Sequence, residues 1–232
     1  MKTIGMIGGM SWESTASYYK AINEGVRETL GGLYSAKILL HSVEFSEIEA
    51  LQHEGRWEEA GNILAEAGKG LAGAGADFLM ICTNTMHKVA GVVEKASGVP
   101  LLHIADATGE VLVKDGVTKV GLLGTGFTME EDFYKGRLAE RFDLDVLIPE
   151  KEERVEVHRV IFEELCMGSI QEASRDAFVK IIENLKHRGA EAVILGCTEI
   201  GLLVKPEDSS VTLYDTTVIH ARAAVEKALS VG

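Results

Sequence analysis

Two short segments of the chain end in residues that could move a proton at a carbon centre. They read GAGADFLMICTNTMH and HRGAEAVILGCTEIG, and each has a small-residue turn, an acid, an apolar run and a polar cluster. When the two are aligned without a gap, Thr83 falls opposite Cys197. Ligands of open α/β sheets bind beyond the carboxyl ends of the strands. If the two halves face each other, Thr83 and Cys197 would approach one ligand from opposite sides.

Opposed proton-handling groups suit a stereoinversion, in which a proton leaves one face of a carbon and another returns to the opposite face. The α-carbon of an amino acid is the obvious substrate. A thiol suits the base role because its ordinary pKa of about 8.5 can be lowered by backbone amides or helix N-termini. The polar residues that follow, Asn84-Thr85 and Thr198-Glu199, would hold the substrate carboxylate and stabilise the negative charge that develops on it.

The other two cysteines are predicted to be structural. Cys82 precedes Thr83 by one position, so in an extended strand its side chain should point to the other face and pack in the core. Cys166 is predicted to pack against helices. Three cysteines without C-x-x-C spacing fit a reducing cytoplasm. The scattered histidines show no H-x-x-x-H spacing, so no metal site is expected.

These groups need a scaffold, and the apolar runs of the chain predict one. Most runs are nearly continuous in Val, Ile and Leu, as in strands that are buried on both faces of a parallel sheet. Helical 3.6-residue periodicity marks Ser14–Leu30, Trp57–Ala74 and Ser174–Arg188. This alternation predicts an α/β fold with parallel sheets. The candidate strands are Thr3–Ile7, Ala36–Leu40, Phe78–Ile81, Leu101–Ile104, Val120–Leu123, Asp145–Ile148, Ala192–Leu195 and Thr212–Tyr214.

The two halves of the chain repeat blocks in the same order. Ile4–Gly8 matches Val120–Gly124, glycines included. Any two βαβ units resemble each other to some degree, but coinciding glycines favour an internal duplication. We predict two pseudo-symmetric subdomains, each with a roughly four-stranded parallel sheet flanked by helices, with the active site at their interface. The expected boundaries are residues 1–115, residues 116–222 and a C-terminal helix end at 223–232.

Composition narrows the class of partner. The net charge of −13, without basic patches, argues against a protein that binds nucleic acid or an anionic membrane. Hydrophobic residues at 46% and charged residues at 25% are ordinary for a globular protein. The opening residues contain no long apolar stretch, so we expect no secretory signal. No apolar run reaches the roughly 18 residues needed to span a membrane. We therefore expect a cytoplasmic protein with a small-molecule substrate.

Three motifs of the chain, at matching spacing, resemble the aspartate/glutamate racemase family: Ile4–Ser11 (IGMIGGMS), Asn84–His87 (NTMH) and Gly196–Ile200 (GCTEI). The resemblance covers essentially the whole chain. It implies two pseudo-symmetric α/β subdomains with the site between them, racemisation of an amino-acid substrate without pyridoxal phosphate or another cofactor, and a homodimer.

One departure from the family concerns the catalytic pair. Typical members have a cysteine in both halves, whereas this chain has Thr83 at the first position. It looks like the L-aspartate/glutamate-specific subgroup, which has Thr there. The resemblance implies that Cys197 abstracts the α-proton, while Thr83, or a water that it holds, delivers one from the other side. Thr is a poor base, so the reverse direction should be slower.

A second departure concerns the anchor for the substrate side chain. Family aspartate racemases place an Arg after the second strand and a Lys in a helix of the second half. Here Cys166 stands where the Lys would be, and Gln52 is a polar substitute with Arg56 nearby. Strict dicarboxylate specificity is therefore in doubt, and neutral amino acids such as homoserine are an alternative to aspartate and glutamate.

The complete prediction has two catalytic and eight substrate-binding residues. Each of Ser11, Thr83, Asn84 and Thr85 could instead cap a helix, and His87 is expected to be a structural hydrogen-bonding residue. Two alternatives stay open: a one-cysteine decarboxylase or isomerase of the same superfamily, and a catalytically silent amino-acid-binding protein. The catalytic residues are Thr83 and Cys197, and the substrate-binding ones are Met10, Ser11, Gln52, Asn84, Thr85, Thr125, Thr198 and Glu199.

Overall fold

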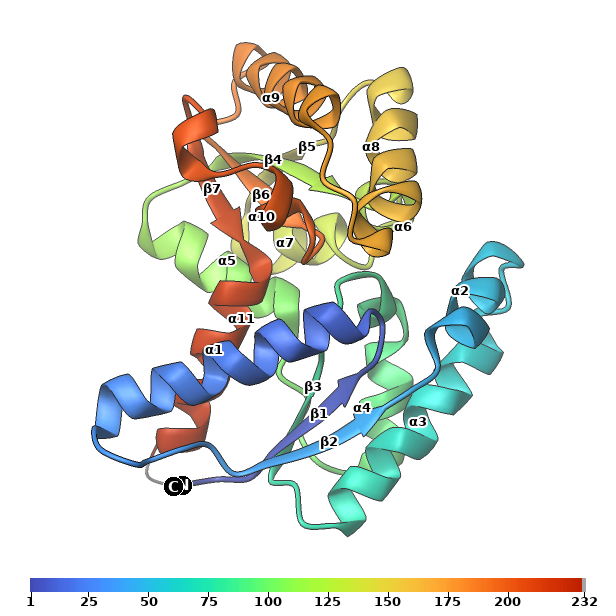
Figure 1. Ribbon diagram of the computed structural model, residues 1–232, viewed down its shortest axis with the longest axis vertical. Coiled ribbons are helices and arrows are strands. Elements are labelled where there is room, and N and C mark those ends of the chain that lie inside the picture. The colour runs from blue at the N-terminus through green and yellow to red at the C-terminus, as the bar shows by residue number, and fades with distance from the viewer. Residues whose placement is uncertain (231–232) are drawn as a thin grey trace. The chain divides into compact units, whose positions relative to one another are not determined.

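Parallel strands form two sheets, one in each of two units of the chain (Figure 1). The computed structural model describes residues 1–230. Unit 1 consists of Met1–Ile104 together with the chain from His220 onward, and unit 2 is Ala105–Ile219. The α/β class with parallel sheets is confirmed.

The sheet of unit 1 has the strand order β2-β1-β3, with β1 (Ile4–Gly8) between β2 (Ile38–Ser42) and β3 (Phe78–Ile81). Its helices begin and end close to the predicted limits where those were given. They are α1 (Trp12–Leu30), α2 (Phe45–His53), α3 (Trp57–Gly73), the 3₁₀ turn η1 (Thr85–Val89), α4 (Ala90–Ser97) and most of α11 (Thr216–Leu229).

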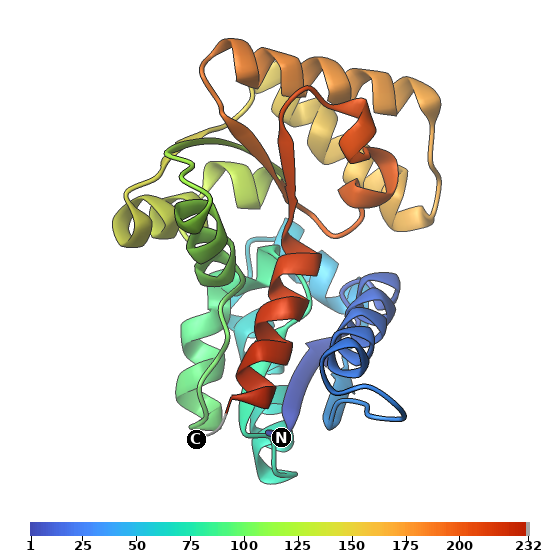
Figure 2. The same cartoon turned by 90° about the vertical axis from the view of Figure 1, so that its left-hand side faces the viewer.

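Both faces of the sheet are covered at β1 and β3, which explains why these two strands are buried along their whole length. Ile4 and Met6 of β1 pack in one cluster with residues of α1 and α11, which lie beside each other in both views (Figure 1, Figure 2). Ile7 packs in the other cluster, with residues of α3 and α4. The Cys82 thiol is fully buried in the α1–α11 cluster, as predicted for a core thiol.

The predicted fourth strand of unit 1, Leu101–Ile104, was wrong. Leu101 forms only an isolated parallel bridge with Leu79, and α5 (Ile104–Lys114) begins three residues later. The polar backbone groups past the bridge are bound by side chains instead of a strand. The Ile104 N–H donates to His87 Nε2 over 3.2 Å, and the Leu102 carbonyl lies 2.9 Å from His220 Nε2.

Unit 2 has the strand order β5-β4-β6-β7. All four predicted strands are present, as β4 (Lys119–Gly124), β5 (Asp145–Leu147), β6 (Ala192–Gly196) and β7 (Thr212–Asp215). Around them lie the rest of α5, α6 (Gly126–Glu130), α7 (Lys135–Phe142), α8 (Lys151–Glu163), η2 (Leu165–Met167), α9 (Glu172–His187), α10 (Ile200–Leu203) and η3 (Pro206–Asp208).

The registers of the two sheets support the duplication. In unit 1, Ile4 pairs with Phe78, and in unit 2 the aligned residues Val120 and Ala192 pair with each other. The isolated bridge between Leu79 and Leu101 likewise has a counterpart, the pair Val193 and Leu213. The two units therefore share one strand order, and the fourth strand of unit 1 is reduced to a single bridge.

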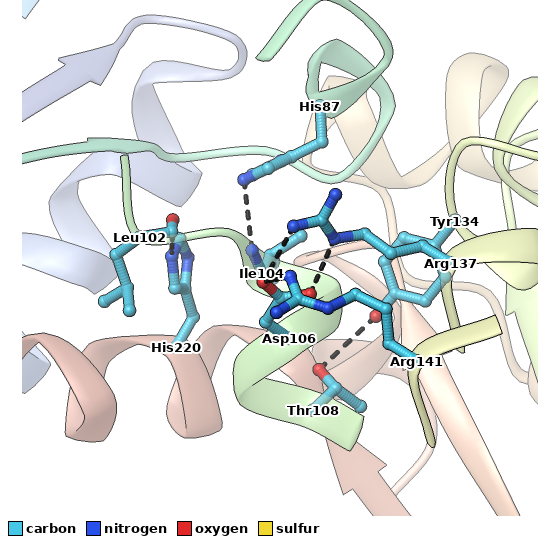
Figure 3. Close-up of polar contacts among 9 residues, drawn as sticks. All are labelled: His87, Leu102, Ile104, Asp106, Thr108, Tyr134, Arg137, Arg141 and His220. Atoms are coloured by element: carbon cyan, nitrogen blue, oxygen red, sulfur yellow. Dashed lines mark hydrogen bonds and ion pairs between the residues drawn. The ribbon is translucent and has the colours of Figure 1, made fainter. Parts of the chain in front are cut away.

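Side chains bind the first turn of helix α5. The N–H of its first residue, Ile104, donates to His87, and the Asp106 carboxylate is bound by two arginines of α7 (Figure 3). Asp106 accepts hydrogen bonds from Arg137 over 2.6 and 2.8 Å and from Arg141 over 2.5 Å. A carboxylate that binds two guanidinium groups fixes its helix firmly to α7.

Candidate active site

The predicted site residues fall into two groups, six in unit 1 and four in unit 2. The first group follows β1 and β3, with Gln52 added from α2. The second follows β4 and β6. All but Gln52 therefore lie just beyond the carboxyl ends of parallel strands, where open α/β sheets bind ligands.

Thr83 lies between β3 and η1 and is half-buried. Its carbonyl oxygen is 2.8 Å from Nδ1 of His87, which is itself buried. Within residues 1–230, the Thr83 hydroxyl makes no hydrogen bond to another group. The predicted capping alternative for Thr83 is thus not realised, and its hydroxyl is available to a ligand.

The residues after Thr83 are buried, and Gln52 reaches them from α2. Asn84 and Thr85 are 2% and 6% exposed. Gln52 is 4% exposed, and its Nε2 donates to the Met86 sulfur over 3.0 Å. The structure therefore places Gln52 against the NTMH segment.

Arg56, the other polar candidate of this region, is occupied elsewhere. Its guanidinium donates to Glu59 over 2.6 Å and to Glu54 over 2.7 Å, and its side chain is 49% exposed. A solvated arginine that is paired twice makes a weak anchor for a substrate carboxylate.

The loop after β1 is joined to the segment that carries Thr83. Ser11 Oγ accepts from the Ser14 amide over 3.2 Å and so caps α1, the alternative foreseen for this residue. Ser14 Oγ donates to the Cys82 carbonyl over 3.0 Å. The buried Met10 packs in the α3–α4 cluster. Ser14, which the sequence did not single out, links the two strand ends.

In unit 2, the Cys197 thiol is bound to a buried carboxylate. Sγ donates to Oε2 of Glu199 over 3.0 Å, and the Thr198 hydroxyl donates to the same oxygen over 2.6 Å. Glu199 is only 5% exposed, whereas Cys197 is half-buried. One carboxylate oxygen thus orients both preceding side chains.

The protonation of Cys197 differs from the expectation of a lowered pKa. Burial raises the pKa of this thiol well above its usual range, and the nearby Glu199 carboxylate and Cys166 raise it further. A backbone hydrogen bond from Glu199 opposes this rise and is outweighed. In the free protein Cys197 is therefore a protonated thiol at neutral pH, and it donates a hydrogen bond to Glu199.

Cys166 lies in η2, where it is half-buried. Because it affects the Cys197 pKa, its thiol belongs to the surroundings of Cys197. The position at which the resemblance implies a Lys thus brings no positive charge here.

Thr125 is used as a helix cap. Its Oγ1 accepts from the Thr128 amide over 3.3 Å and lies 3.2 Å from the Thr128 hydroxyl, at the start of α6. The next residue, Gly126, donates its N–H to Nδ1 of His158 over 3.0 Å. His158 was not foreseen, because it lies far along the chain on α8.

Asp215 is a further residue that sequence reasoning missed. It ends β7, its carboxylate accepts from the Thr217 amide over 2.8 Å, and burial raises its pKa. Gly201 packs so closely that a Cβ there would lie 2.6 Å from Asp215 Oδ2. An acid at a strand end before two threonines was the available signal.

Among residues 1–230, no group of three or more His, Cys, Asp or Glu side chains is arranged to bind a metal ion. None of the helices described is both long and apolar enough to cross a bilayer.

Comparison with known proteins identifies the family. The sequence profile of Asp/Glu/hydantoin racemases matches residues 7–224. A Yersinia pestis protein assigned as an Asp/Glu racemase is 53% identical, with 99% of this chain and 100% of that chain covered and a TM-score of 0.93. An aspartate racemase homologue from Pyrococcus horikoshii is 40% identical over 99% and 100% of the two chains, with a TM-score of 0.85.

More distant relatives share the fold. The aspartate racemase of Picrophilus torridus is 20% identical, with 98% of this chain and 94% of that chain covered and a TM-score of 0.77. The profile match and the two closer structures, taken with the polar strand ends described above, lead to one conclusion: this chain belongs to the Asp/Glu/hydantoin racemase family of isomerases.

Proposed function

We propose that this protein racemises a small L-amino acid, aspartate or glutamate or a neutral analogue, without pyridoxal phosphate. Cys197 handles the proton on one face of the α-carbon and Thr83 handles the proton on the other. The observation that carries the proposal is the equivalence of these residues, which follow β3 and β6, two strands in equivalent registers. Membership of the family supports it.

The first step concerns Cys197 and Glu199. Because the thiol is protonated in the free protein, it must lose a proton before it can act as a base. The Glu199 carboxylate already accepts the hydrogen bond from Sγ. Cys197 gives its own proton to Glu199 and takes the α-proton. The Cα–H bond and the original S–H bond break, while a carboxyl O–H bond and a new S–H bond form.

The second step adds a proton to the other face. The Thr83 hydroxyl, or a water that it binds, gives a proton to the α-carbon, and solvent restores the original protonation of both sides. Each turnover removes one proton and adds one. Because enantiomers have equal free energies, kcat/KM must be the same in both directions. The weakness of Thr83 as a base can therefore appear in kcat and KM separately but not in their ratio.

Binding of the substrate follows from the polar groups near each strand end. Asn84, Thr85 and Thr198 provide amide and hydroxyl groups for the α-carboxylate, whose negative charge grows in the transition state. Gln52 is buried and neutral, and it is our candidate for contact with the substrate side chain. With Arg56 held in ion pairs, neutral amino acids belong in the substrate panel beside aspartate and glutamate.

The deciding experiment is α-hydrogen exchange. The purified protein is incubated in D₂O without pyridoxal phosphate, with a panel of L- and D-amino acids. We expect deuterium at Cα and D-product from an L-substrate, both lost in Cys197→Ser. A folded wild-type protein that exchanges no amino acid would contradict the proposal.

A one-cysteine decarboxylase is the second candidate, and one observation favours it. Such an enzyme needs a single proton donor, and the Cys197 thiol donates a hydrogen bond to Glu199 over 3.0 Å, with burial raising its pKa. Release of CO₂ from a substituted malonate, together with no exchange on amino acids, would select this function. Tight amino-acid binding without exchange or CO₂ release would indicate a silent binding protein.

A further inference from the structure

The His87 ring connects two backbone groups of unit 1. Its Nε2 lies 3.2 Å from the Ile104 amide nitrogen, and its Nδ1 lies 2.8 Å from the Thr83 carbonyl oxygen. An amide N–H can only donate, so Nε2 must be the unprotonated, accepting nitrogen. A carbonyl can only accept, so Nδ1 must carry the hydrogen. The two partners together specify one neutral tautomer.

The surroundings of the ring favour the same neutral form. His87 is 3% exposed, and the rings of His103 and His220 lie 4.6 and 5.7 Å from it, centroid to centroid. Burial lowers the pKa of His87 well below its usual range, and the two neighbouring histidines lower it further. A second proton would also place an Nε2–H against the Ile104 N–H, two donors facing each other.

The segment that carries Ile104 is itself held by a second histidine. Figure 3 shows the ring of His87 directed at Ile104 and the ring of His220 directed at Leu102. His220 Nε2 lies 2.9 Å from the Leu102 carbonyl, and its Nδ1 lies 3.0 Å from the Tyr18 hydroxyl. Two rings therefore hold the short segment before α5, one through an N–H and one through a carbonyl.

We propose that His87 is a positioning residue for Thr83. The neutral ring holds the Thr83 peptide through Nδ1–H, with Ile104 fixing the other side of the ring, and so sets where the Thr83 hydroxyl points. The hydroxyl makes no hydrogen bond of its own within residues 1–230, so its direction depends on the backbone that carries it. This inference rests on the proposed function, because it assigns His87 to the Thr83 face of the reaction.

Two substitutions separate the two hydrogen bonds. In His87→Asn, the amide nitrogen takes the place of Nδ1 and can still donate to the Thr83 carbonyl, but it does not reach Ile104. In His87→Gln, the longer amide takes the place of Nε2 and can accept from Ile104, but the Thr83 carbonyl loses its donor. Both variants lose the ring, so each controls for the packing defect of the other.

The readout is a ratio measured in D₂O: D-product formed against deuterium incorporated into the remaining L-substrate. This ratio compares the Thr83 step with the Cys197 step, and a general loss of stability would leave it unchanged. We expect it to fall about tenfold or more in His87→Gln and to stay within about threefold of wild type in His87→Asn. Equal ratios in the two variants would overturn the positioning role.

A second measurement tests the inference without activity. ¹⁵N NMR of His87 in the wild-type protein should show a protonated Nδ1 and an unprotonated Nε2 throughout the range from about pH 5 to pH 8. A proton on Nε2, or titration within that range, would overturn the inference even in an active racemase. If the wild type exchanges no amino acid, the proposed function fails, and the NMR result alone decides the state of His87. If the variants do not fold, the NMR result likewise decides the state of His87.

Discussion

Thr83 and Cys197 occupy equivalent strand ends, yet the two ends hold their residues in opposite ways. At Thr83 the backbone carbonyl is bound by His87 while the hydroxyl makes no bond within the described chain. At Cys197 the side chain itself is bound, by Glu199. The two units thus share a strand order, whereas the two chemical groups and the contacts that hold them differ. We therefore expect Cys197 and Thr83 to act differently. A thiol whose pKa depends on Glu199 would act on one face of the substrate α-carbon, and a weakly acidic hydroxyl would donate a proton on the other.

The strongest test removes the thiol. In Cys197→Ser, a far weaker acid replaces the group that we propose takes the α-proton, so exchange and D-product formation should both fall by about 10³-fold. The measurement is deuterium incorporation at Cα of the L-substrate. Cys82→Ala is the matched control, because that thiol is buried in the core of unit 1; its activity should stay within a few-fold of wild type. Equal losses in both variants would mean that Cys197 has no special part.

Removing the hydroxyl tests the other end. Thr83→Val keeps the shape of the side chain and removes its oxygen, so D-product should fall by about 10²-fold. Exchange on the L-substrate through Cys197 should continue at a rate within about tenfold of wild type. Chiral chromatography and mass spectrometry measure the two quantities in one sample, with Thr83→Ser as the control that keeps a hydroxyl. If exchange and D-product formation fell equally, Cys197 and Thr83 would not act on separate faces of the α-carbon as proposed.

The effect of Glu199 on the Cys197 thiol can be tested through the pKa of that thiol. Glu199 raises the pKa of Cys197, so Glu199→Gln should lower it and increase the thiolate fraction at any pH below the pKa. Each unit of decrease gives about ten times more thiolate. We therefore expect iodoacetamide to alkylate Cys197 several-fold faster at pH 8 in this variant. The pH at which the alkylation rate is half-maximal should also move downward. A slower reaction in the variant would contradict the proposed role of the carboxylate.

The smallest expected effect concerns the caps that begin α1 and α6. Ser11 and Thr125 each accept a hydrogen bond from an amide three residues ahead. Ser11→Ala and Thr125→Ala should each lower the free energy of unfolding by about 1 kcal/mol, as measured by urea denaturation. If the two residues also contact substrate, KM will rise in addition. An unchanged KM in either variant would mean that the residue caps its helix and does not contact the substrate.

Much of the scaffold could be predicted from the sequence because strands β1, β3, β4 and β6 are buried on both faces. That burial produces continuous apolar runs. The predicted strands include all seven strands of residues 1–230, and the one expected at Leu101–Ile104 does not form. The backbone groups of that segment are bound by His87 and by His220. His220 lies more than a hundred residues from this segment along the chain, and a local sequence pattern cannot indicate so distant a partner.

The site was predictable in residue type but not in protonation. Thr83, Cys197 and their polar neighbours were found from two aligned strand ends. Whether Cys197 is a thiol or a thiolate depends on how deeply Glu199 is buried beside it, which only the folded chain determines. The same is true of His87, whose tautomer is set by two backbone groups that the sequence does not bring together.

The last helix has a consequence for how the protein is made. Ala221, Ala224 and Ala228 of α11 belong to the same core as Ile4 and Met6 of β1, and the Lys2 amide donates to the Ala228 carbonyl over 2.8 Å. During synthesis, unit 2 leaves the ribosome whole, while unit 1 waits for the final helix before its core can close. A nascent chain stalled before residue 220 would therefore present the Thr83 strand with one face of its sheet still open.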